Sequence, residues 1–79
     1  MPKSPADAVA RDLATAQTAI DRLAATAEPE AFNALLALSA AAGEALGTSA
    51  RLLAESASWA AVGEASGTTR QAAWARWHT

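Results

Sequence analysis

Residues 58–77 read SWAAVGEASGTTRQAAWARW, and this stretch decides how the C-terminal third of the chain folds. A helix-sized segment runs up to Gly67, two hydroxyl residues follow, and a second short segment begins at Arg70. Gly67 suits a turn, because glycine adopts a positive φ without strain. Ser58 and Thr69 stand where N-cap side chains are expected. The stretch therefore predicts two short helices joined by a tight turn, the second running to the end of the chain.

The preceding residues also read as helix, since roughly a third of the 79 residues are alanine and no strand-like alternation occurs. Ser4-Pro5 is a start signal for a first helix, which we expect to end at Glu28-Pro29 because a residue before proline disfavours the helical conformation. A second helix then runs to about Ser56. A break at residues 47–49 is the alternative, but the apolar spacing continues in register across them, which favours one long helix. The predicted fold class is all-α.

Apolar side chains on the two upstream helices step by alternating three and four residues, which is the heptad spacing of a helix seam. A chain of this length without cysteine has a small core and no disulfide, so oligomerisation is the usual remaining stabiliser. We predict that residues 1–57 form an alanine-rich helical hairpin that pairs with a second copy. Packing of the seam within one protomer is the alternative, and both can hold. The predicted dimerisation residues are Val9, Leu13, Ile20, Leu23, Phe32, Leu35 and Leu46.

The residue inventory argues against several classes of protein. His78 is the single histidine, and only a chance approach to Glu44 or Glu55 would give it metal-binding partners, so no metal or other cofactor is predicted. No nucleophile constellation, acid/base pair or glycine-rich phosphate loop occurs, so we expect neither an enzyme nor a small-molecule ligand. No apolar run approaches the length of a membrane span, and no signal-peptide core is present. A cytoplasmic protein without membrane partners is expected.

The formal net charge of −2 is distributed unevenly along the chain. Residues 1–47 hold six acidic and three basic side chains, net −3, whereas residues 48–79 hold two acidic and three basic, net +1. A mildly basic end on an acidic body is compatible with DNA binding, with a modest electrostatic contribution per protomer. Within that basic end, we expect Arg51 and Arg76 to be either solvated charges or phosphate contacts.

Helical periodicity separates an interior face and an outer face on the last helix. The side chains expected to meet inside are Val62, Ala73 and Trp77, with Leu52 and Leu53 of the preceding helix. Those left facing outward are Gln71, Ala75 and His78, with Trp74 at the edge and Arg70 and Arg76 on the flanks. Trp59 and Trp77 are expected to fill the core, and His78 to be a frayed terminal residue. Polar side chains near the helix N-terminus are typical of a helix that reads DNA.

Residues 58–77 resemble a helix-turn-helix of small bacterial regulators with the signature S-W-x-x-I-G-x-A-L-G-V-S-R-Q-A, which is shared with sigma-factor region 4 type domains. The resemblance covers about 20 of the 79 residues and agrees at Trp59, Val62-Gly63, Gly67, Arg70-Gln71-Ala72 and Arg76-Trp77. Ser66 replaces the usual leucine of the pattern, Thr68 the usual valine and Ala73 a larger apolar residue. The motif is therefore expected to depend on the helices before it. The DNA-binding residues predicted from the pattern and the resemblance together are Ser58, Thr68, Thr69, Arg70, Gln71, Trp74 and Arg76.

These expectations lead to a homodimeric, sequence-specific DNA-binding protein, a transcriptional regulator that reads the major groove with its C-terminal helix. Residues 58–79 would form the helix-turn-helix and complete one domain with residues 1–57. Double-stranded DNA and a second copy of the chain are the predicted partners, on half-sites roughly 10 base pairs apart in an inverted repeat. The alternative is a protein–protein adaptor built on a degenerate helix-turn-helix.

Overall fold

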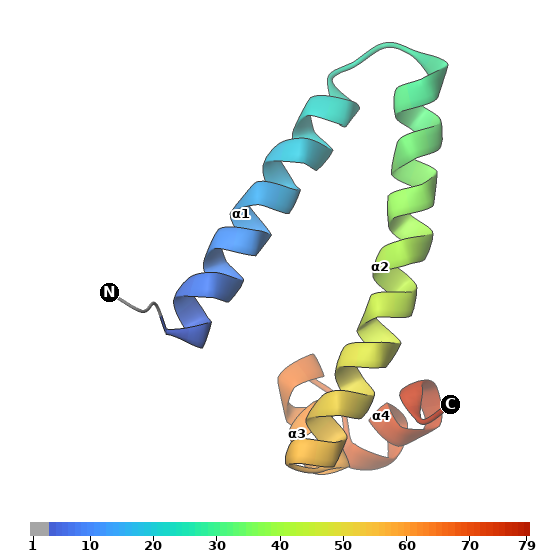
Figure 1. The fold of residues 1–79 in the computed structure, drawn as a ribbon. Coiled ribbons are helices and arrows are strands. Elements are labelled where there is room, and N and C mark those ends of the chain that lie inside the picture. Colours follow the sequence, from blue (N-terminus) through green and yellow to red (C-terminus); the bar gives the residue numbers. More distant parts are fainter. Residues whose placement is uncertain (1–3) are drawn as a thin grey trace. The chain divides into compact units, whose positions relative to one another are not determined.

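The computed structural model describes residues 4–79, which form four helices and, within that range, no strand. The helices are α1 (Pro5–Ala24), α2 (Pro29–Ser56), α3 (Trp59–Ser66) and α4 (Arg70–Trp77) (Figure 1). The predicted all-α class is therefore confirmed. The chain divides into two compact units, one comprising the residues up to Leu38 and the other Ser39–Thr79, and each is described by itself.

The start of α1 follows the predicted signal, whereas its end does not. Ser4 is the N-cap, and its Oγ accepts a hydrogen bond from the Asp7 N–H at 3.2 Å. The helix ends at Ala24, four residues before the predicted stop at Glu28. Where the helix ends, the Thr26 N–H donates to the Leu23 carbonyl at 3.1 Å and the Thr26 hydroxyl to the Arg22 carbonyl at 2.7 Å. These bonds satisfy carbonyls that a continued helix would otherwise have used.

Helix α2 is continuous through residues 47–49, so the favoured alternative of one long helix is confirmed. It begins with Pro29, and the Glu28 carbonyl accepts bonds from the Ala31 and Phe32 N–H groups at 3.0 and 3.3 Å. Thr48, which could have capped a new helix, instead donates its hydroxyl to the Glu44 carbonyl one turn earlier at 3.3 Å. A threonine bonded in this way stays within a helix rather than starting one.

The core of the unit Ser39–Thr79 is small and built largely from alanine. Ala50 of α2, Val62 of α3 and Ala73 of α4 are buried together, and Ala73 has no exposed surface. The half-buried residues packed around them are Leu53, Ala54, Trp59 and Trp77. The predicted inward positions of Val62, Leu53, Ala73 and both tryptophans are thus confirmed. The prediction for Leu52 is wrong: it is 60% exposed, and Ala50 takes the inward position on α2.

Most of the predicted dimerisation residues present their apolar side chains to solvent in the single chain. Val9, Leu13 and Ile20 of α1 are exposed, as are Phe32 and Leu46 of α2. Leu23 and Leu35, the remaining two, are half-buried. Burying an apolar side chain of this kind is worth about 1.5–3 kcal/mol, and the five exposed ones lack that contribution in the single chain.

Candidate nucleic-acid interface

Helix α3 begins and ends at the residues that the sequence predicts. Ser58 is its N-cap in an extended conformation, and its Oγ accepts a bond from the Ala61 N–H at 3.0 Å. Gly67 is left-handed at φ 72° and ψ 28°. The Gly67 N–H donates to the Glu64 carbonyl at 3.3 Å, and the Thr68 N–H to the Gly63 carbonyl at 2.8 Å. This pair of bonds is a Schellman motif, which stops α3 and turns the chain towards α4.

Gly63 allows α4 to start directly against the backbone of α3. A Cβ atom at position 63 would lie 2.8 Å from the carbonyl carbon and oxygen of Thr69 and 2.9 Å from the Arg70 nitrogen. Real Cβ atoms essentially never approach so closely, and here the neighbouring atoms are backbone. Glycine at this position therefore fixes the distance between the two helices where α4 begins.

Helix α4 has a buried side and an exposed side, and three predicted site residues share the exposed one. Thr69 is its N-cap, and the threonine Oγ1 accepts a bond from the Ala72 N–H at 3.0 Å. Arg70, Gln71 and Trp74 are exposed and together line an open hollow of about 290 Å³. Because Ala73 is buried against α2 and α3, the hollow opens on the outer surface of the unit. The hollow combines a guanidinium, an amide and an indole ring within one helical turn.

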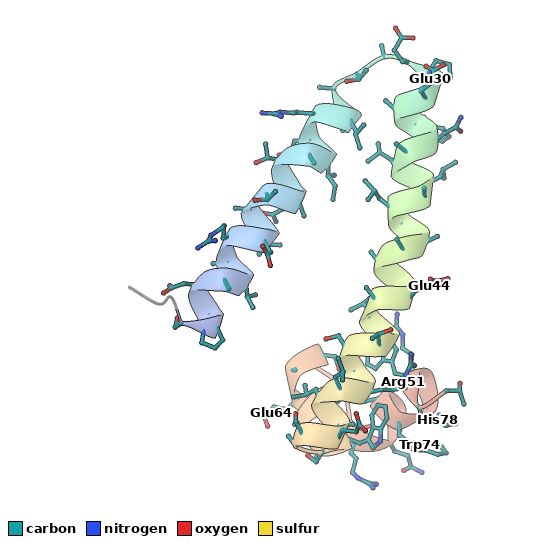
Figure 2. All side chains as sticks on the ribbon, in the orientation of Figure 1. Glu30, Glu44, Arg51, Glu64, Trp74 and His78 are labelled. Carbon is teal, nitrogen blue, oxygen red and sulfur yellow. The ribbon has the colours of Figure 1, made fainter. Side chains whose placement is uncertain are left out.

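Trp74 and His78 form a stacked pair on the same exposed side of α4. Their ring centroids lie 3.9 Å apart with an interplanar angle of 7°. The His78 Nδ1 atom lies 2.6 Å from the Trp74 carbonyl oxygen, a hydrogen bond that orients the imidazole (Figure 2). His78 was expected to be a frayed terminal residue. It is exposed beyond the end of α4, where its ring stacks on Trp74. The spacing of Trp74 and His78 in the sequence could have indicated this pair, because residues four apart on a helix are neighbours.

Arg51 of α2 holds the C-terminal end of α4 (Figure 2). Its Nη1 donates to the Trp77 carbonyl at 3.0 Å and to the Thr79 backbone oxygen at 2.9 Å. A cation that bonds the last carbonyls of a helix satisfies groups without a helical partner and complements the helix dipole. Gly47, one turn earlier, leaves room for the guanidinium, since a Cβ there would lie 3.1 Å from Nη1. Arg51 is therefore a structural clamp, a role that was not expected for it. It is half-buried rather than a fully solvated charge, and its expected phosphate contact stays a prediction.

Arg76 lies apart from the other predicted contacts on α4. It is about 200° around the helix from Trp74, at 100° per residue. Its guanidinium carbon lies 4.7 Å from the centre of the Trp77 ring, a cation–π contact. It also lines a separate hollow of about 420 Å³ with Arg51 and Glu44. The structure therefore groups Arg70, Gln71 and Trp74, but not Arg76.

The remaining predicted contacts surround the turn between α3 and α4. Ser58 and Thr69 are both exposed and act as helix caps, and their oxygens accept the capping bonds. Thr68 is exposed in the turn itself. Each cap hydroxyl keeps its own hydrogen as a donor, because a hydroxyl both accepts and donates. These residues can therefore serve the fold and still bond an anion.

The side chains and helices of residues 4–79 also bear on metal binding and membrane insertion. No three histidine, cysteine, aspartate or glutamate side chains gather there closely enough to hold a metal ion. No helix in that range is long and apolar enough to cross a membrane. Comparisons with family models, curated proteins and solved structures gave no match to this chain.

Proposed function

We propose that the chain is a homodimeric, sequence-specific DNA-binding regulator, in which α3, the Gly67 turn and α4 form a helix-turn-helix. The observation that carries the proposal is the orientation of α4. The buried Ala73 and the close approach at Gly63 fix one side of α4 on the core, leaving Arg70 and Gln71 exposed at its N-terminal end. A recognition helix needs base-reading side chains in that position.

The chemistry of the exposed residues supports reading of the major groove. An arginine bonds the O6 and N7 atoms of guanine, and a glutamine bonds the N6 and N7 atoms of adenine. The Thr69 hydroxyl and the first N–H groups of α4 are suited to a phosphate beside those bases. Phosphate contact and base reading then come from the same helical turn. The phosphate contacts would hold α4 in the position from which Arg70 and Gln71 meet the base edges.

The exposed apolar seam supports a dimer with two-fold symmetry. A pair of helix-turn-helix units related by a two-fold axis reads two half-sites about one helical turn apart, roughly 10 base pairs, in an inverted repeat. Dimerisation also doubles the number of basic groups that meet the DNA. This matters because residues 48–79 carry a net charge of only +1 per protomer.

The proposal is tested by DNA selection from a random duplex library, followed by titration with fluorescence anisotropy. Wild-type protein is expected to enrich an inverted repeat, and the double variant Arg70→Ala, Gln71→Ala to lose that preference while keeping its helicity. The matched control is Gln17→Ala with Arg22→Ala, which removes the same types of side chain from the exposed surface of α1. Sequence preference that survives in the Arg70/Gln71 variant would refute the assignment of α4.

A protein–protein adaptor is the second candidate, and an apolar hollow favours it. This hollow of about 230 Å³ lies between α2, α3 and α4, and Leu46, Leu53, Val62 and Trp77 are among its lining residues. Salt distinguishes the two functions. Binding to DNA weakens steeply between low and physiological salt because counterions are released, whereas an apolar protein interface responds little.

A further inference from the structure

From the stacked pair Trp74–His78, we propose that α4 reads the 5-methyl group of a thymine next to the base contacted by Gln71. The proposal rests on the DNA-binding function proposed above, and it specifies one base of the target. Trp74 would supply the methyl contact, and His78 would hold the indole ring in place.

The exposure of Trp74 is the first support. Trp74 is 47% exposed, although Trp59 and Trp77 of the same unit pack against the core. A large aromatic side chain at the surface loses the free energy of burial unless a partner covers it. Trp74 also stands among polar residues rather than in the apolar seam, so a partner with both polar and apolar groups fits its surroundings.

The rigidity of the ring is the second support. His78 stacks on the indole at 3.9 Å and is itself held by the 2.6 Å bond to the Trp74 carbonyl. The two rings therefore constrain each other, and the loss of side-chain freedom on binding is reduced. A side chain that is ordered before binding can distinguish a base with a methyl group from one without it. A freely rotating side chain can instead adjust its position when the methyl group is absent.

The position of Trp74 relative to Gln71 selects the base. Three residues of helix rise by about 4.5 Å, close to the 3.4 Å spacing of successive bases in DNA. Gln71 and Trp74 border the same hollow, so they can reach the same or adjacent base pairs. In the major groove the thymine methyl is the apolar group that distinguishes the base edges, and cytosine lacks it.

The first test uses wild-type protein and the half-site that selection provides. Each thymine is replaced in turn by uracil, which removes only the methyl group. At one position per half-site, uracil is expected to weaken binding about fourfold, the value of one buried methyl-sized group. If binding is specific but uracil is tolerated at every position, the methyl-reading proposal is overturned while the proposed function stands. If no duplex binds at all, both are overturned.

Variants then assign the effect to the stacked pair. Trp74→Ala is expected to bind thymine and uracil duplexes equally, and His78→Ala to show a smaller difference than wild type. Leu52→Ala is the matched control, because Leu52 is also exposed and apolar but lies on α2. It should keep the full fourfold difference. A fourfold difference that persists in Trp74→Ala would overturn the role of Trp74.

Discussion

Replacing Gly63 with alanine gives the sharpest test of how α4 is held on α3. In an ordinary helix interior this substitution stabilises, by about 1 kcal/mol, because glycine has the greater conformational freedom to lose. At Gly63 the added Cβ would meet the Thr69 carbonyl group at 2.8 Å. Ordinary van der Waals contact begins near 3.4 Å, so a separation of 0.6 Å between α3 and the start of α4, the difference of these two distances, would restore it.

The magnitude follows from what has to move. The contacted atoms belong to the backbone at the N-cap of α4, and no flexible side chain is available to give way. Overpacking of this kind costs about 1–3 kcal/mol, against a gain in helix propensity of about 1 kcal/mol. We therefore expect Gly63→Ala to lower the free energy of unfolding by up to about 2 kcal/mol, the difference of these two figures. For a domain of this size the melting temperature falls by about 4–8 °C per kcal/mol.

Gly43 provides the matched control, because it lies inside α2 and a Cβ there would have no atom within 4 Å. Gly43→Ala should stabilise the protein by about 0.5–1 kcal/mol. Thermal unfolding of wild type and both variants, followed by circular dichroism and tryptophan fluorescence, measures the two changes at one protein concentration. Equal stabilisation by both substitutions would show that α4 does not press on Gly63 and that this contact does not fix the orientation of α4.

Three further substitutions probe the caps, the clamp and the seam. Thr69→Ala should lower the free energy of unfolding by about 1 kcal/mol, because the N-cap bond is lost. In the same thermal unfolding experiments, Thr68→Ala should change it by no more than about 0.5 kcal/mol. Equal losses in the two variants would contradict the capping role of Thr69. Arg51→Met should lower the urea concentration at the midpoint of unfolding, because it removes two hydrogen bonds worth about 0.5–1.5 kcal/mol each. An unchanged midpoint would argue against the clamping role of Arg51. Leu13→Asp should convert the dimer to a monomer in sedimentation equilibrium, whereas Leu52→Asp should leave the dimer intact. A dimer that survives Leu13→Asp would exclude this part of the seam from the dimer interface.

The parts of the fold that depend on local chemistry could be predicted from the sequence. Ser58 and Thr69 cap helices through bonds to residues three positions away, and Gly67 is left-handed because of its own backbone freedom. Such signals need no knowledge of tertiary packing. The outward position of Gln71 likewise followed from the helical repeat and a core direction set by Ala73 and Trp77. The grouping of Arg70 and Trp74 with Gln71 did not, because the repeat placed Trp74 at the edge and Arg70 on a flank with Arg76.

The parts that depend on tertiary contacts could not be predicted. On α2, alanine is so frequent that several helical phases look equally apolar, which is why Leu52 was assigned to the core in place of Ala50. The role of Arg51 was missed because its acceptors lie 26 and 28 residues away in the chain. Only the spacing of Gly47 and Arg51, one turn apart, indicates that the arginine side chain can extend along α2 towards Gly47.

The small core has a consequence for how α4 is positioned. Alanine side chains bury little apolar area, so Ala50 and Ala73 contribute less to the free energy of folding than larger apolar residues would. They do allow backbones to approach closely, and directional contacts at the ends of α4 then gain importance. Gly63 and the Thr69 cap position its N-terminal end, and Arg51 its C-terminal end. Loosening either end should therefore reorient the exposed face of α4 before the helix itself unfolds, and the proposed sequence preference for DNA should be lost at milder perturbation than helicity.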